Sequence, residues 1–198
     1  MPLQNRVTPD GRIIAVHERG RWMGNRGCLH DDNRNLGRAL WKHPSWVICT
    51  LELLPGRPAP RQLMAPRHYT ELFFLDEATA LSAGHRPCAR CRRAAHDAFR
   101  HAAGGFDRTG DLDQQLHGER VAILKGRAQP VAQADSLPDG AFIKADGQAM
   151  LIAEGQAHPW TPGGYGAPRP LPRDPVPILT PATSLKALAN GYAVQMAL

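Results

Sequence analysis

Two cysteines, Cys88 and Cys91, stand close together in the chain and have arginines around them. The run from 83 to 93, Ala-Gly-His-Arg-Pro-Cys-Ala-Arg-Cys-Arg-Arg, holds half of the chain's four cysteines. Two intervening residues allow both sulfurs to turn toward one point, and thiolate pairs are preferred ligands of Zn²⁺. The spacing therefore predicts half of a zinc site. The alternative is a pair of reduced thiols that only pack.

The remaining ligands have to come from elsewhere in the chain. Cys28 and His30 are two residues apart, so on a strand they would share a face and either or both could reach one ion. Asp31 follows His30 and could orient an imidazole ligand. Cys49 is a further candidate, although a thiol within an apolar strand is more typical of a small core residue.

The run 83–93, which we call the knuckle, is preceded by a predicted strand and a short predicted helix. Residues 69–75 are rich in β-branched and aromatic side chains, which favours a buried strand. Asp76 is a typical N-cap, and Gly84 suits the position at which a helix ends. A second helix is predicted over 92–103, with one apolar face made of Ala94, Ala95, Ala98, Phe99 and Ala102.

These elements resemble part of a known family. Phe73-Phe74 and the run Ala80-Leu-Ser-Ala-Gly-His-Arg-Pro-Cys-Ala-Arg-Cys-Arg-Arg are similar to the C-terminal half of the metal-binding domain of Ada-type DNA alkylation-repair proteins. In that family a Phe-rich strand, an Ala-rich helix and such a knuckle supply two of four cysteine ligands to zinc. The resemblance implies a zinc-stabilised domain that binds DNA in repair. It is confined to this short stretch.

The sequence departs from the family pattern at the other half of the site. The family has two cysteines separated by three residues there, whereas this chain has Cys28 and His30. The departure puts the methyl-accepting role of the family's cysteine in doubt. We therefore expect no methyl transfer to Cys28.

Charge is distributed unequally along the chain. Residues 1–101 contain 16 Lys and Arg against 9 Asp and Glu, whereas the remaining residues contain 8 against 9. Fifteen of those 16 cations are arginine, whose planar guanidinium pairs with phosphate and guanine. This predicts a nucleic-acid partner, and the family resemblance implies DNA rather than RNA. The alternative is an arginine-rich surface that is only solvated.

Two clusters could form the nucleic-acid interface. Residues 19–27 combine glycines with arginines and a tryptophan, a composition suited to a loop that grips a strand; a glycine-rich turn over the metal site is the other interpretation. The knuckle supplies the second cluster. The candidate residues are Arg19, Arg21, Trp22, Arg26, Arg86, Arg90, Arg92 and Arg93.

We predict an α+β fold in two parts, a metal-binding part over 1–105 and a β-rich part over 111–198. A strand over 45–53 should turn at Pro55-Gly56, and strands 141–145 and 148–153 should form a hairpin. Residues 158–165 are expected to form a rigid exposed loop.

The functional hypothesis is a zinc-stabilised nucleic-acid-binding protein in DNA repair or processing. No apolar run is long enough to span a bilayer and no signal region is evident, so we expect a cytoplasmic protein without a membrane partner. The alternatives are a metal-dependent enzyme acting on nucleic acid, as a nuclease or in base processing, or a protein-interaction module. Asp113 and His117, four residues apart on a predicted helix, could serve acid–base chemistry or be an ordinary surface pair.

Overall fold

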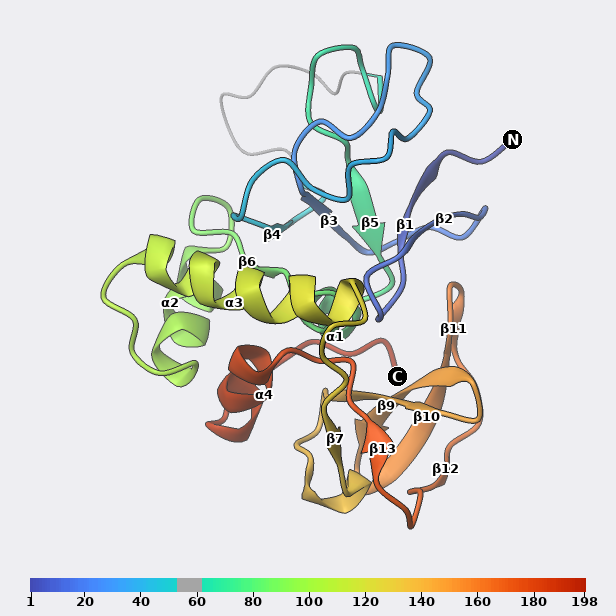
Figure 1. Ribbon diagram of the computed structural model, residues 1–198, viewed down its shortest axis with the longest axis vertical. Coiled ribbons are helices and arrows are strands. Elements are labelled where there is room, and N and C mark those ends of the chain that lie inside the picture. The colour runs from blue at the N-terminus through green and yellow to red at the C-terminus, as the bar shows by residue number, and fades with distance from the viewer. Residues whose placement is uncertain (53–61) are drawn as a thin grey trace.

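The computed structural model describes residues 1–52 and 62–198, and these form an α+β fold, as predicted. The first sheet is mixed and has the strand order β2-β1-β5-β3-β4-β6 (Figure 1). Its strands are β1 (Gln4–Val7), β2 (Ile13–Ala15), β3 (Trp22–Asn25), β4 (Val47–Cys49), β5 (Leu72–Phe74) and β6 (Arg86–Pro87). The β1–β5 and β4–β6 pairs are parallel and the others antiparallel.

The second sheet belongs to the C-terminal half and is antiparallel. Its strands are β8 (Phe142–Ala145), β9 (Gln148–Ala153), β10 (Gln156–Thr161), β11 (Gly164–Tyr165) and β12 (Arg169–Pro170). Strands β7 (Val131–Ala132) and β13 (Val176–Pro177) form a separate pair. The predicted hairpin between β8 and β9 is confirmed. Asp146 and Gly147 have φ angles of 51° and 75°, the left-handed conformation that a primed two-residue turn requires.

Four helices lie in the described part: α1 (Glu77–Ser82), α2 (Arg93–Ala102), α3 (Thr109–Leu124) and α4 (Ala182–Ala189). The Asp76 side chain caps α1 as predicted, because its Oδ1 accepts a hydrogen bond of 2.8 Å from the Thr79 N–H. Gly84 follows this helix with φ of +82°, and the Arg120 side chain fills the space that a Cβ would need. Helix α1 contacts both β5 and β8 and so lies between the two sheets.

Three local predictions are wrong. The glycine-rich run 19–27 contains strand β3 in the middle of the sheet, and residues 158–165 belong largely to β10 and β11. The third, the apolar face of α2, is wrong in part: Phe99 and Ala102 are buried as predicted, but Ala94 and Ala98 are exposed. His96 is buried instead, because its ring packs toward the Pro87 carbonyl oxygen at 3.1 Å. The turn expected at Pro55-Gly56 lies outside the described residues.

The predicted boundary between the two parts does not divide the hydrophobic core. One buried cluster joins Phe74 and Leu81 from the first part to Leu116, Leu188 and Tyr192 from the second. Burying these side chains together stabilises both parts at once.

Within 1–52 and 62–198, none of the helices has both the length and the apolar character that a bilayer span needs.

The C-terminal segment is held by two buried carboxylates at the start of α1. Glu77 accepts hydrogen bonds from the Tyr192 hydroxyl at 2.6 Å and from the Gln195 N–H at 3.2 Å. Asp76 accepts from the Tyr165 hydroxyl at 2.7 Å and from the Ala197 N–H at 2.9 Å. Figure 1 accordingly shows the C-terminus close to α1, between the two sheets.

This shared core predicts one cooperative unfolding transition. Leu116→Ala removes a fully buried side chain of α3, so we expect it to lower the free energy of unfolding by about 2–5 kcal/mol. The control Leu40→Ala, at a side chain 44% exposed, should change it by less than about 0.5 kcal/mol. Urea denaturation followed by circular dichroism and tryptophan fluorescence measures both. Two separate transitions, with only one of them shifted by Leu116→Ala, would contradict a shared core.

Candidate metal centre

Three of the four cysteines meet at one place in the structure. The sulfur atoms of Cys49, Cys88 and Cys91 all lie within 4.8 Å of one another, and the three side chains are half-buried. Three sulfur donors at this spacing could hold a soft metal ion.

Strand pairing brings these cysteines together. Strand β4 runs parallel to β6, with Val47 opposite Arg86 and Ile48 opposite Pro87. The Cys88 N–H continues the pairing by donating to the Ile48 carbonyl oxygen at 3.0 Å. Cys49 therefore ends its strand beside the point at which the chain leaves β6 and enters the knuckle.

The backbone of the knuckle is directed at a sulfur. The Arg90 N–H donates to Cys88 Sγ at 3.4 Å, and the Arg92 N–H donates to the Cys88 carbonyl oxygen at 3.0 Å. A sulfur that accepts backbone N–H groups is stabilised as the thiolate, which is the form that ligates metals. The knuckle is thus preorganised for a metal ligand at Cys88.

The three thiols differ in pKa because they form hydrogen bonds with one another and are partly buried. The pKa of Cys88 is lowered mainly by a hydrogen bond that the Cys49 thiol donates to it. The backbone N–H groups of Cys91 and Arg90 lower the Cys88 pKa further. The same hydrogen bond and burial raise the pKa of Cys49. Burial is the main cause that raises the pKa of Cys91. A metal ion would bind to an existing thiolate and displace the protons of the other two thiols.

Three protein ligands leave room for a fourth. Within the described ranges, no further His, Cys, Asp or Glu joins the group formed by the three sulfurs. Residues 53–61, outside those ranges, include none of these four residue types. Sites with three protein ligands and one open position are typical of zinc ions that bind water or substrate.

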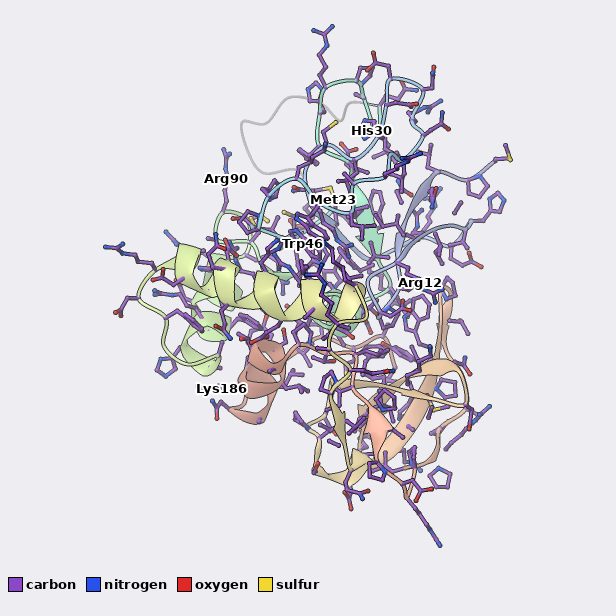
Figure 2. The ribbon with its side chains drawn as sticks, viewed as in Figure 1. Arg12, Met23, His30, Trp46, Arg90 and Lys186 are labelled. Atoms are coloured by element: carbon purple, nitrogen blue, oxygen red, sulfur yellow. The ribbon has the colours of Figure 1, made fainter. Side chains whose placement is uncertain are left out.

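The structure changes the ligand set that the sequence suggested, because Cys28 and His30 do not join the cluster. His30 is only 8% exposed, and its ring nitrogens lie 2.7 Å from Thr70 Oγ1 and 3.2 Å from the Ala65 carbonyl oxygen. Cys28 Sγ donates weakly to the His30 carbonyl oxygen at 3.7 Å. Both residues organise the loop in which Figure 2 shows His30.

Several arginines expected at a nucleic-acid interface are buried instead. Arg26 is fully buried, its guanidinium lies 4.1 Å from the centre of the Trp46 ring, and desolvation lowers its pKa to about 9. Arg86 is 4% exposed and forms a bidentate pair with Asp113, with both N–O distances 2.8 Å. Neither guanidinium is accessible to a phosphate at the surface. Because both carboxylate oxygens of Asp113 accept hydrogen bonds from Arg86, Asp113 does not form the acid–base pair with His117 that the spacing suggested.

The other members of that predicted set divide into two groups. Arg92 pairs with Glu77 at 2.8 Å and lies over Trp22 at 4.0 Å, so both residues are engaged within the protein. Arg19, Arg21, Arg90 and Arg93 are exposed. Figure 2 shows Arg90 extending away from the ribbon. The exposed cations thus include Arg90 and Arg93, which lie on either side of Cys91 within the run 83–93.

Comparison with models of protein families, with curated proteins and with solved structures gives no match for this chain. These comparisons therefore do not identify an Ada-type domain, and the resemblance of residues 73–93 to that family stays a prediction from the sequence.

The ligand set predicts different outcomes for two cysteine substitutions. Cys49→Ser removes one of three sulfur donors, so its affinity for Co²⁺ should fall by more than the roughly 10–100-fold that loss of an outer hydrogen-bond partner costs. Cys28→Ser is the matched control and should bind Co²⁺ like the unaltered protein. The thiolate-to-cobalt absorption band reports the binding. Equal losses in the two variants would contradict the assigned ligands.

The lowered pKa of Cys88 predicts unusual alkylation kinetics in protein stripped of metal. The reaction rate of an ordinary thiol with iodoacetamide rises roughly tenfold per pH unit below its pKa, because only the thiolate reacts. Cys88 should instead react at a nearly constant rate between pH 6 and 8 and should slow only at acid pH, where its thiolate becomes protonated. Peptide mass spectrometry measures the rate at each cysteine. A tenfold rise per pH unit at Cys88 would show that its pKa is ordinary.

Proposed function

We propose that this protein binds Zn²⁺ through Cys49, Cys88 and Cys91 and that the adjoining arginine-bearing surface binds DNA. One observation carries the proposal: the Arg90 N–H is bonded to Cys88 Sγ while the Arg90 side chain is exposed. A metal held at Cys88 would therefore also fix the backbone from which this cation projects.

The donor set supports zinc as the ion. Thiolates favour soft or borderline ions, and Zn²⁺ commonly takes cysteine ligands in small protein domains. Zn²⁺ bound here would link β4 to the knuckle, so part of its binding free energy would be folding free energy.

The exposed cations support a polyanionic partner. Arg90 and Arg93 stand on either side of Cys91, while Arg21 precedes the tryptophan that Arg92 covers. Guanidinium groups pair with phosphate oxygens in a bidentate fashion. The resemblance of residues 73–93 to the Ada-type domain favours DNA over RNA and a role in repair.

A second candidate function is metal-dependent chemistry on nucleic acid. The three-ligand cysteine set favours it, because an open position on Zn²⁺ can activate water or polarise a substrate oxygen. In a structural centre a fourth protein ligand would normally close this position. Cleavage or base release from labelled DNA, dependent on added Zn²⁺, would distinguish this activity from binding alone.

The interface is tested by Arg90→Ala and Arg93→Ala in the zinc-loaded protein. Removing one arginine–phosphate pair should make the slope of log K against log salt concentration shallower by about 0.9 and weaken binding at all sequences alike. Fluorescence anisotropy with a labelled duplex between about 50 and 200 mM salt measures both quantities.

The matched control is Arg173→Ala, an exposed arginine of the C-terminal half, which should leave the slope unchanged. An absence of binding at about 50 mM salt would refute DNA binding, since electrostatic affinity is greatest at low salt. An equal effect of Arg173→Ala would place the interface elsewhere.

A further inference from the structure

A second candidate site lies where the two sheets approach each other, away from the cysteines. A cavity of about 190 Å³, open to solvent on one side, is lined by the turn after β1 and by residues of β8, β9 and β10. Arg12 and Asp10 line it from the turn, and Lys144, Gln148 and Trp160 line it from the second sheet. Figure 2 shows Arg12 at this junction.

The volume selects a small ligand. A cavity of about 150 Å³ is enough to bind benzene, whereas sites for drug-sized molecules occupy about 300–1,000 Å³. A cavity of about 190 Å³ therefore has room for one planar base, and the sugar and phosphate of a nucleotide would lie outside it, toward the exposed Arg12 and Lys144.

The inner lining suits a planar ring. Trp160 is half-buried, and its Nε1–H donates to Thr79 Oγ1 at 3.1 Å, which fixes the orientation of the indole. Leu179 and Pro9 add buried apolar surface. Stacking of a base on an aromatic side chain contributes about 1–3 kcal/mol. Gln148 donates to the Trp160 carbonyl oxygen at 3.1 Å, and its Oε1 bonds to none of the described residues.

The outer lining suits an anion. The Arg12 side chain is 74% exposed and uses its Nε–H on Asp10 at 2.8 Å, while its terminal nitrogens have no hydrogen-bond partner in the described ranges. Lys144 is exposed, and its side-chain ammonium likewise makes no hydrogen bond or ion pair with the described residues. Asp10 also accepts from the Thr8 hydroxyl. Two cations against one carboxylate leave an excess of positive charge.

We propose that this cavity binds a nucleotide, with its base against Trp160 and its phosphate between Arg12 and Lys144. A planar ring joined to an anionic group is the chemistry that both linings share. A free nucleotide or an unpaired nucleotide within a strand would supply it. The site includes no cysteine and neither Arg90 nor Arg93, so this inference goes beyond the proposed DNA binding and does not depend on it.

The experiment uses the full chain with adenosine 5′-monophosphate, adenosine and inorganic phosphate as probes in isothermal titration calorimetry. Adenosine monophosphate should bind more tightly than either part alone. Arg12→Ala and Lys144→Ala should each weaken it by about fivefold, the size expected for one exposed ion pair. Binding of adenosine should not change, because the ring surface is intact. Both side chains are exposed, so unchanged thermal melts are expected.

A short 5′-phosphorylated single strand distinguishes the two sources. Binding of adenosine monophosphate supports a free nucleotide, and binding of the strand alone, with the same sensitivity to Arg12→Ala and Lys144→Ala, supports a nucleotide within a strand. The proposal is overturned if neither probe binds at millimolar concentration, or if both variants bind as the unaltered protein does.

The two proposals can fail independently. Arg90→Ala and Arg93→Ala should leave binding of adenosine monophosphate unchanged, and Arg12→Ala should leave the salt slope of duplex binding unchanged. A loss of duplex binding with intact nucleotide binding would refute the proposed function alone. The reverse result would refute the nucleotide site alone.

Discussion

The parallel pairing of β4 with β6 sets the positions of the cysteines and of the buried arginine beside them. The Arg86 N–H donates to the Trp46 carbonyl oxygen at 3.1 Å, and the Cys88 N–H donates to the Ile48 carbonyl oxygen at 3.0 Å. This ladder places Cys49 at the knuckle and turns the Arg86 side chain toward Asp113 on α3. A metal at the three sulfurs would join the ends of the same two strands. Strand pairing and a bound metal would therefore stabilise the same arrangement.

Arginine has two physical uses in this protein. Arg26 and Arg120 lie near the two sides of one buried indole, with their guanidinium carbons 4.1 and 3.9 Å from the centre of the Trp46 ring. Desolvation lowers the pKa of each to about 9, so both remain charged at neutral pH. Carbonyl oxygens and the π face compensate part of that burial cost. Arg26, like Arg86, belongs to residues 1–101, so part of the positive charge of that half is structural and only its exposed arginines are available to a polyanion.

A chain of contacts connects the cluster of Cys49, Cys88 and Cys91 with the C-terminal segment. Arg92 follows Cys91 directly and forms a buried ion pair with Glu77 at 2.8 Å. Glu77 in turn accepts hydrogen bonds from Tyr192 and Gln195 near the end of the chain. Removing one partner of a buried ion pair is costly, because the other charge is left without compensation. Order at the knuckle and docking of the C-terminal segment are therefore energetically linked through one carboxylate.

The features that depend on neighbouring residues could be predicted from the sequence alone: the close pair Cys88 and Cys91, the Asp76 cap, the hairpin turn at Asp146-Gly147 and the α+β class. Local backbone preferences and short spacings decide these, so they can be read along the chain. The folded structure was needed to show that Cys49 joins the pair while Cys28 and His30 do not, and that Arg26 and Arg86 are buried. An isolated thiol in an apolar strand has the same local pattern whether it packs or ligates. Whether Cys49 packs or ligates depends on which strand lies beside it, and hydrogen bonding between segments far apart in the chain selects that strand.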